Sequence, residues 1–153
     1  MEEEIKFMKE ALKEARKSYD KGEIPVGAVV VKDGIIISRA HNLKETKNDC
    51  TNHAELLAIK KASKKLNSWR LTGCTMYVTL EPCSMCTGAL ILSRIDRVVI
   101  GTMDEKTGAC GSVLNLSKDY KFNHSLELET GVMEDECRDI LQKFFKELRK
   151  KQK

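Results

Sequence analysis

The sequence predicts a three-layer α/β fold, in which a mixed sheet of about five strands carries helices on both faces. Segments with helical periodicity alternate along the chain with short apolar runs of strand length. The order strand, helix, strand over residues 75–101 predicts a right-handed parallel crossover. With 153 residues, the chain has the size of one domain, and we expect a single domain over residues 1–153.

The first elements are predicted to be a helix and a hairpin. Residues 2–21 place apolar side chains at helical spacing, which indicates an amphipathic helix packed on the core. Apolar runs at 26–31 and 35–40 then flank Asp33-Gly34. An Asp-Gly pair between two apolar runs is a strong hairpin signal, so we expect the first two strands to pair antiparallel.

The middle of the chain predicts two helices with a strand between them. A polar, turn-rich loop at 43–52 leads to a helix from 53 to about 66. A short β-rich run follows at 75–80, then a helix that opens at Pro82, and then an apolar strand at 97–101.

The last part of the chain combines an irregular segment with a long helix. Residues 102–125 are the least periodic part of the chain, and a loop of this length is often functional. A fifth strand is expected at 126–132. The final helix ends in the basic segment 149–153, and its apolar face consists of Cys137, Ile140, Leu141, Phe144, Phe145 and Leu148.

The candidate zinc ligands are His53, Cys83 and Cys86. One imidazole and two thiolates supply three protein ligands, which leaves the fourth position of a tetrahedral zinc open to water, as in catalytic sites. On a helix opening at Pro82, sulfurs three residues apart point the same way. Glu55 is then free to handle the protons of that water.

Two helix N-termini are expected to face this metal. Asn52 or Thr51 can cap a helix that opens with His53, and the second helix carries the cysteine pair. The positive ends of both helices favour thiolates. The alternative is a structural zinc staple, but such a site requires a fourth protein ligand at a comparable spacing. The other cysteines show no disulfide framework, and we interpret them as reduced thiols: Cys50, Cys74, Cys110 and Cys137.

Charge is concentrated near the C-terminus. The whole chain has a formal net charge of +4, whereas residues 138–153 contain seven Lys or Arg and two acids, a net of +5. A basic helix end favours a polyanion such as RNA, although its cations can also simply complement the helix dipole. No apolar run approaches the roughly 20 residues that a membrane span needs, so we expect neither signal peptide nor membrane segment, and a cytoplasmic protein.

The motifs resemble those of a known family. His53-Ala54-Glu55 with Pro82-Cys83-x-x-Cys86 matches the signature of the zinc nucleobase deaminases. Nearly the whole chain resembles the bacterial tRNA-specific adenosine deaminases, which have the cytidine deaminase-like fold. The motifs that carry this likeness include Pro25-Val26-Gly27-Ala28-Val29, His41-Asn42, Thr79-Leu80-Glu81, Ser93-Arg94-Ile95 and, most discriminating, Asp104-x-Lys106-Thr107-Gly108-Ala109-x-Gly111-Ser112.

The resemblance implies hydrolysis of adenosine to inosine at the wobble position of tRNA, in an arginine tRNA. It implies one Zn²⁺ per chain on His53, Cys83 and Cys86, with a zinc-bound hydroxide as nucleophile and Glu55 as proton shuttle. It further implies a homodimer that binds the anticodon stem-loop. Substrate contacts are implied for Asn42, the Ala54 backbone amide, Asp104 and Phe144.

Two positions depart from the family pattern, and two other functions remain open. Met103 stands where relatives often carry a basic residue, and Asp49-Cys50 stands where they commonly have Asp-Pro. A deaminase of a free base or nucleotide, of the guanine, cytidine or deoxycytidylate type, would share the zinc site without needing a basic tail. A zinc-stapled RNA-binding domain would share the tail and release no ammonia.

Overall fold

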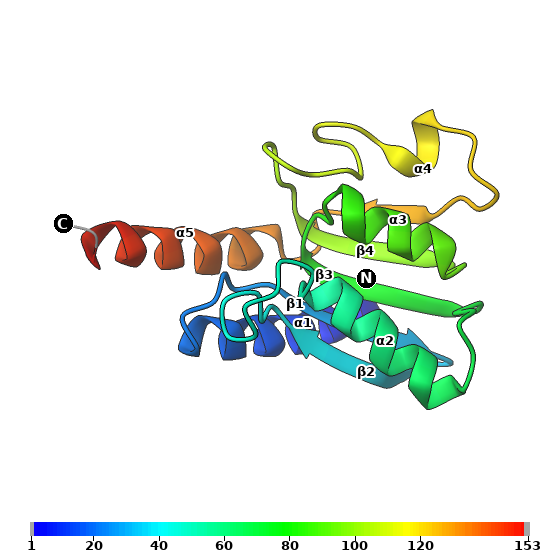
Figure 1. Cartoon of the computed structure of the whole chain (residues 1–153), viewed down its shortest axis with the longest axis horizontal. Coiled ribbons are helices and arrows are strands. Elements are labelled where there is room, and N and C mark those ends of the chain that lie inside the picture. The colour runs from blue at the N-terminus through cyan, green and yellow to red at the C-terminus, as the bar shows by residue number, and fades with distance from the viewer. Residues whose placement is uncertain (1, 152–153) are drawn as a thin grey trace.

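The computed structural model describes residues 2–151, which form one five-stranded sheet flanked by helices (Figure 1). The strand order is β2-β1-β3-β4-β5; β1 runs antiparallel to β2 and β3, whereas β3, β4 and β5 are parallel. The predicted mixed sheet and parallel crossover are therefore confirmed. In chain order the elements are α1 (Glu2–Asp20), β1 (Gly27–Lys32), β2 (Ile35–His41), α2 (Ala54–Leu66), β3 (Cys74–Leu80), α3 (Ser84–Leu92), β4 (Arg97–Thr102), α4 (Leu116–Asp119), β5 (Glu127–Thr130) and α5 (Glu134–Lys151).

The hairpin between β1 and β2 closes where the sequence predicts it. Lys32 pairs with Ile35, and the two residues between them have positive φ angles of 52° at Asp33 and 76° at Gly34. Two consecutive left-handed residues match the right-handed twist of the paired strands, and Asp-Gly adopts them readily.

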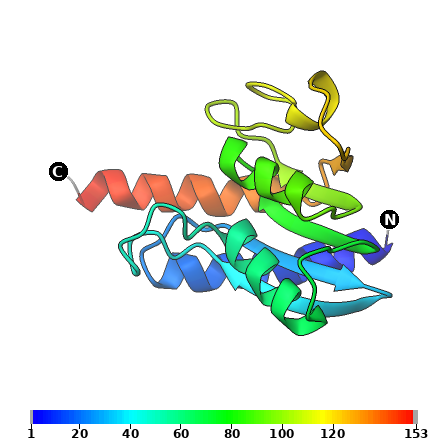
Figure 2. The ribbon, with the colours of Figure 1, turned by 45° about the vertical axis from the view of Figure 1, so that its right-hand side comes forward.

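Side chains of alternate strand residues enter two separate cores. Val29 and Val31 point to the face that packs on α1 and α5, whereas Ala28 and Val30 point to the face that packs on α2 and α3. Figures 1 and 2 show α2 and α3 on the near face of the sheet, with α1 and α5 behind it. The predicted three layers are thus confirmed, and the second core is closed by the small residues of α2, Ala54, Ala58 and Ala62.

The helices next to the zinc motif begin later than predicted. Pro82 was expected as the first helical residue, but α3 begins at Ser84 because Cys83 has extended backbone angles (φ −75°, ψ 179°) and occupies the N-cap. Likewise α2 begins at Ala54, and His53 is its N-cap. The predicted capping by Thr51 or Asn52 is wrong, because His53 holds the cap position and Thr51 donates instead to the Asp49 side chain, at 2.9 Å from its N–H and 2.7 Å from its hydroxyl.

The irregular segment is more ordered than its sequence suggests. It contains the short helix α4, which Asn115 caps by accepting a hydrogen bond from the Lys118 N–H at 3.0 Å. The predicted fifth strand is present as β5, although it is shorter than the expected 126–132. None of the helices over residues 2–151 is long and apolar enough to cross a membrane.

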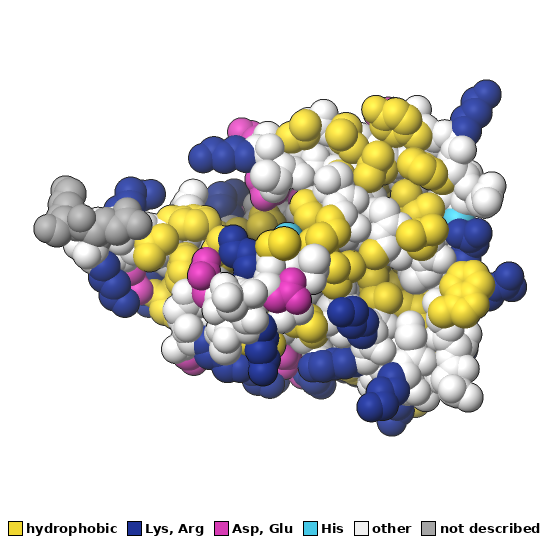
Figure 3. Space-filling view, viewed as in Figure 1, with side chains coloured by type: hydrophobic (Ala, Val, Ile, Leu, Met, Phe, Trp, Pro, Cys, Tyr) yellow, Lys and Arg dark blue, Asp and Glu magenta, His cyan; other side chains and the backbone are white. Residues whose placement is uncertain are grey.

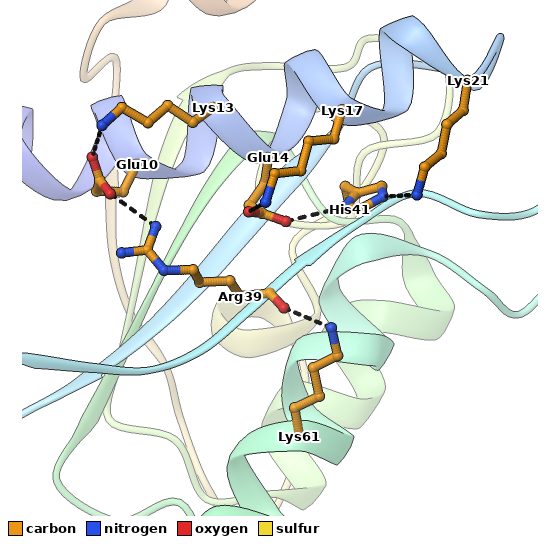
Figure 4. A network of polar contacts seen from close by, with 8 residues as sticks. All are labelled: Glu10, Lys13, Glu14, Lys17, Lys21, Arg39, His41 and Lys61. Carbon is orange, nitrogen blue, oxygen red and sulfur yellow. Dashed lines mark hydrogen bonds and ion pairs between the residues drawn. The ribbon is translucent and has the colours of Figure 1, made fainter.

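A polar network joins α1 to the end of β2 (Figure 4). Lys21 donates to Nε2 of His41 at 2.9 Å, so Nδ1 of His41 carries the proton and donates to Glu14 at 3.0 Å. Burial alone would raise the pKa of Glu14, but its hydrogen bonds with Lys17 and His41 outweigh burial and lower it. The next residue, Asn42, accepts a hydrogen bond from Ser18 at its backbone oxygen (2.9 Å), so α1 fixes the chain where β2 ends.

Candidate active site

The first turns of α2 and α3 bring three potential metal ligands together. Nδ1 of His53 lies 3.7 Å from Sγ of Cys83 and 3.5 Å from Sγ of Cys86, and all three ligand atoms lie within 4.8 Å of one another. His53 and Cys83 are the N-caps of their helices, and Cys86 lies in the first turn of α3. Both N-termini lie side by side in Figures 1 and 2, so their positive ends point at the same place, as predicted.

The spacing of these atoms fits zinc. Ligands at the corners of a tetrahedron, about 2.3 Å from zinc for sulfur and about 2.0 to 2.1 Å for nitrogen, lie roughly 3.5 to 3.8 Å apart. The observed nitrogen to sulfur distances fall in this range. Among the described residues, the cluster has three members and does not include Cys50, which is exposed. The cluster therefore has the donor set of an open, catalytic type of zinc site.

The two thiols differ in acidity. The pKa of Cys83 is lowered to about 4, first by a hydrogen bond from the Cys86 thiol and also by His53. The same sulfur to sulfur hydrogen bond raises the pKa of Cys86. Cys83 is thus the sulfur that ionises first, and metal binding requires the second proton to leave as well.

Glu55 is the second residue of α2, two residues after His53. Its side chain is buried, with 4% exposed, and it lines the same pocket as His53 and Cys83. Burial raises the pKa of Glu55 to about 7, against the lowering effects of its own backbone N–H and of His53. A carboxyl group with a pKa near neutrality can both accept and donate a proton, which is the property that general acid-base catalysis requires.

The pocket extends from this cluster to the surface and has a volume of about 790 Å³. Figure 3 shows the surface hollowed where α5 leaves the body of the molecule. Its floor contains His53, Glu55 and Cys83. Its walls include the loop after β2, the loop after β4 and one face of α5, together with residues just before β1 and at the end of β3. The wall residues include Asn42, Lys44, Met103, Asp104, Lys106, Thr107, Glu134, Arg138, Leu141, Gln142 and Phe145.

The structure brings some predicted substrate contacts to the pocket and not others. Asn42 and Asp104 line it. Ala54 is buried as the first residue of α2 and does not line the pocket, although its backbone N–H is one of those at a helix start that lack an intrahelical partner. Phe144 lies against Tyr19, with ring centroids 5.9 Å apart, whereas its neighbour Phe145 lines the pocket. A contact of Phe144 with the substrate stays a prediction.

Comparison with known proteins identifies the family. The sequence model of the MafB19-like deaminases matches residues 2–149. The chain is 54% identical to the tRNA-specific adenosine deaminase of Bacillus subtilis (strain 168) over 147 residues, which cover 96% of this chain and 91% of that protein. The chain belongs to the tRNA-specific adenosine deaminase family.

Other members of the family agree with this assignment. The tRNA-specific adenosine deaminase of Aquifex aeolicus (strain VF5) is 50% identical over 143 residues, 94% of either chain. A solved structure from a study of A-to-I editing by tRNA:A34 deaminases at the wobble position of transfer RNA superposes with a TM-score of 0.86 at 40% identity. That match covers 89% of this chain and 99% of the other, so the deaminase fold expected from the motifs is confirmed.

Two buried glutamates beside the pocket received no role from the sequence. Glu81, with 2% exposed, accepts hydrogen bonds from the loop after β4. Glu23, with 1% exposed, accepts hydrogen bonds from the backbone of Glu45 and Thr46 in the loop after β2. Glu81 directly precedes the Pro-Cys of the zinc motif and belongs to one of the family motifs, Thr79-Leu80-Glu81, but nothing in the sequence singled out Glu23.

Proposed function

We propose that this chain hydrolyses adenosine to inosine at the wobble position of tRNA, in an arginine tRNA. The observation that carries the proposal is a single pocket. At its floor lie an open zinc-type ligand cluster and the buried carboxyl of Glu55, and its wall carries both cations (Lys44, Lys106 and Arg138) and acids (Asp104, Glu105 and Glu134). The names of the relatives, tRNA-specific adenosine deaminases, support this substrate.

The proposed chemistry assigns separate tasks to the floor residues. His53, Cys83 and Cys86 would hold one Zn²⁺. A zinc ion on these ligands supplies a Lewis acid that lowers the pKa of water toward neutrality, so that water can attack C6 of the adenine. Glu55 would take one proton from the attacking water and pass it to N1 of the base. It would then take the second proton from the new hydroxyl on C6 and pass it to the departing amine, so that C6 keeps a carbonyl oxygen and ammonia leaves. Its pKa of about 7 suits each of these transfers.

The proposed recognition uses the wall residues. An adenine within a stacked loop cannot reach the floor, so the base must be extruded at a cost of a few kcal/mol. Lys44, Lys106 and Arg138 lie at the wall, where their charges favour the phosphates beside the extruded base. Asn42 contacts the nucleoside, Asp104 contacts its neighbour, and Phe145 offers an aromatic face for stacking.

The chain is further proposed to work as a homodimer. Several large hydrophobic side chains are exposed on or near α3 and α4, namely Met85, Leu92, Val113, Tyr120 and Phe122. Figure 3 shows hydrophobic side chains gathered over this part of the molecule. A mass measurement in solution at micromolar concentration should give a dimer, and Leu92→Glu, which introduces a charge at a side chain that is 69% exposed, should give a monomer.

The proposal is tested by comparing substrates. An anticodon stem-loop with adenosine at the wobble position should be converted to inosine far faster than free adenosine, guanine, cytidine or deoxycytidylate is deaminated. In total tRNA, inosine should form at the wobble position of an arginine tRNA. Equal turnover of free adenosine and stem-loop, or conversion of only a free base or nucleotide, would rule out tRNA as the substrate.

A further inference from the structure

The carboxylate of Glu81 holds four hydrogen-bond donors of one loop. Oε1 accepts from the Asp104 N–H at 2.8 Å and from the Ser112 hydroxyl at 2.5 Å. Oε2 accepts from the N–H groups of Cys110 and Ser112, at 2.9 and 3.0 Å. We name residues 103–112 the recognition loop. Both ends of the recognition loop are thus tied to a single side chain, directly after β3 and two residues before Cys83.

The recognition loop is shaped to receive this carboxylate. A Cβ atom added at Gly108 would lie 2.2 Å from Cδ and from Oε1 of Glu81, so the close approach requires glycine. The Ala109 N–H donates to the Pro82 oxygen at 2.9 Å, which adds a second attachment to the same short segment.

The bound part of the loop presents residues to the pocket. Asp104 accepts hydrogen bonds from the Lys106 N–H at 3.0 Å and from the Thr107 hydroxyl at 2.7 Å, which forms a tight turn. Asp104, Lys106 and Thr107 line the pocket, as does Glu81 beneath them. The backbone N–H of Asp104 is itself a donor to Glu81, so the position of the turn depends directly on this carboxylate.

We propose that Glu81 is a positioning residue for RNA recognition. Its carboxylate fixes the recognition loop so that Asp104 and Lys106 stand at the pocket wall in a set position relative to the zinc-type cluster. Glu81 acts through the loop and takes no part in proton transfer. This inference rests on the proposed function, because it assigns the loop to the nucleotides that flank the reacting adenine.

Glu81→Gln tests the anchoring directly. Glutamine keeps the size of the side chain, but its NH₂ group would face donors, so two of the four hydrogen bonds lose their acceptor whichever way the amide turns. Amide hydrogen exchange should become at least about tenfold faster at Asp104 if the NH₂ replaces Oε1, or at Cys110 and Ser112 if it replaces Oε2, because a buried donor loses its partner. Exchange in β3 and β4 should not change, and zinc content should stay at the wild-type level.

The matched control is Glu23→Gln. Glu23 is equally buried and accepts the N–H groups of Glu45 and Thr46 at 3.0 and 2.5 Å, so the same change releases the loop at 43–52 instead. Faster exchange should be confined to the recognition loop in one variant and to residues 43–52 in the other. Equal, general acceleration in both variants would show loss of stability rather than loss of an anchor, and would overturn the proposal.

A second variant reaches the same contact from the loop. Gly108→Ala does not change residue 81, but its added Cβ would push the Glu81 carboxylate away from the loop. This variant should therefore accelerate amide exchange in the recognition loop, as Glu81→Gln does. With an anticodon stem-loop as substrate, both variants should raise KM at least about tenfold and leave kcat within about threefold of wild type. A fall in kcat with unchanged KM would overturn a positioning role.

A double-mutant cycle shows whether Glu81 and Asp104 affect stem-loop binding through the same contact or independently. If Glu81 acts through Asp104, then Asp104→Asn should weaken stem-loop binding clearly in the wild type and only slightly in Glu81→Gln. Additive effects would contradict the proposal. If the wild-type chain converts no stem-loop, the proposed function fails and the recognition role fails with it. The exchange experiment needs no substrate and would then still decide whether Glu81 anchors the loop.

Discussion

The floor and the wall of the pocket are positioned by different means. The floor residues His53 and Cys83, with Cys86 beside them, lie in or just before the first turns of α2 and α3, two helices packed on the sheet. The loops of the wall have little regular structure, and buried glutamates hold them by hydrogen bonds to backbone N–H groups. The chemical groups thus depend on helix packing, whereas the two wall loops are held by the side chains of Glu23 and Glu81.

The contrast is sharpest between Glu55 and Glu81. Both are buried, at 4% and 2% exposed, and both line the pocket. Burial raises the pKa of Glu55 to about 7, which suits proton transfer. Glu81 has its oxygens occupied by four donors of the recognition loop. Two glutamates of similar burial are therefore suited to different roles, proton transfer for Glu55 and anchoring of the recognition loop for Glu81, because the hydrogen-bond donors around them differ.

Loss of a floor ligand should have the largest effect. Cys86→Ala leaves two protein ligands, fewer than the three of catalytic zinc sites, so zinc content and inosine formation should both be lost. Elemental analysis and a stem-loop assay measure this. Cys50→Ala is the control, because Cys50 is exposed and outside the cluster, and it should keep one zinc per chain. Loss of zinc from the control would mean that the site has four protein ligands.

Removing the proton carrier should have the next largest effect. Glu55→Gln should lower kcat by about 10² to 10⁴-fold, the range for a general acid-base residue, with zinc content and stem-loop affinity near wild type. Rapid-quench kinetics together with metal analysis provide the readout. A parallel fall in zinc content would make Glu55 a ligand and contradict its assigned role.

Alanine substitutions at the neighbouring residues Phe144 and Phe145 test which of the two rings contacts the RNA at the pocket wall. Phe145→Ala should weaken stem-loop binding by about 1 to 3 kcal/mol, the range for base stacking on an aromatic ring, with little change in stability. Phe144→Ala should instead lower the free energy of unfolding by about 3 kcal/mol, because that ring is buried. Fluorescence anisotropy and denaturant unfolding separate the two. The reverse pattern would make Phe144 the substrate contact, as the family resemblance implies.

The smallest effect is expected from the end of α5. Deleting residues 149–153, of which 152 and 153 lie outside the described part of the chain, should reduce the slope of log affinity against log salt. Each lost phosphate contact reduces it by about 0.7 to 0.9. Turnover at saturating stem-loop should stay near wild type, because residues 149–151 are not among those that line the pocket. An unchanged slope would mean that the basic tail merely complements the helix dipole.

The features that the sequence predicted are local ones. The hairpin at Asp33-Gly34, the pair Cys83-Cys86 and the pair His53-Glu55 each depend on spacings within one turn of chain or helix, which can be interpreted without knowing the fold. The exact helix starts were missed because His53 and Cys83 have extended backbone angles and serve as N-caps.

The features that the sequence did not predict depend on long-range contacts. The partners of Glu81 lie 23 to 31 residues further along the chain, and three of the four are backbone N–H groups, which leave no mark in the sequence. Phe144 and Phe145 differ by only about 100° around α5, so the choice between them depends on how that helix packs. Apolar periodicity alone placed both on the same face.

The most direct test compares Glu55→Gln with Glu81→Gln in one experiment. Single-turnover inosine formation, followed over a range of enzyme concentrations on one anticodon stem-loop, gives the rate at saturation and the dissociation constant for each variant. The Glu55 variant should lose its saturating rate and keep its dissociation constant. The Glu81 variant should bind at least about tenfold more weakly and react at nearly the wild-type rate once bound. A saturating rate that falls equally in both variants, with unchanged binding, would contradict the division between floor and wall.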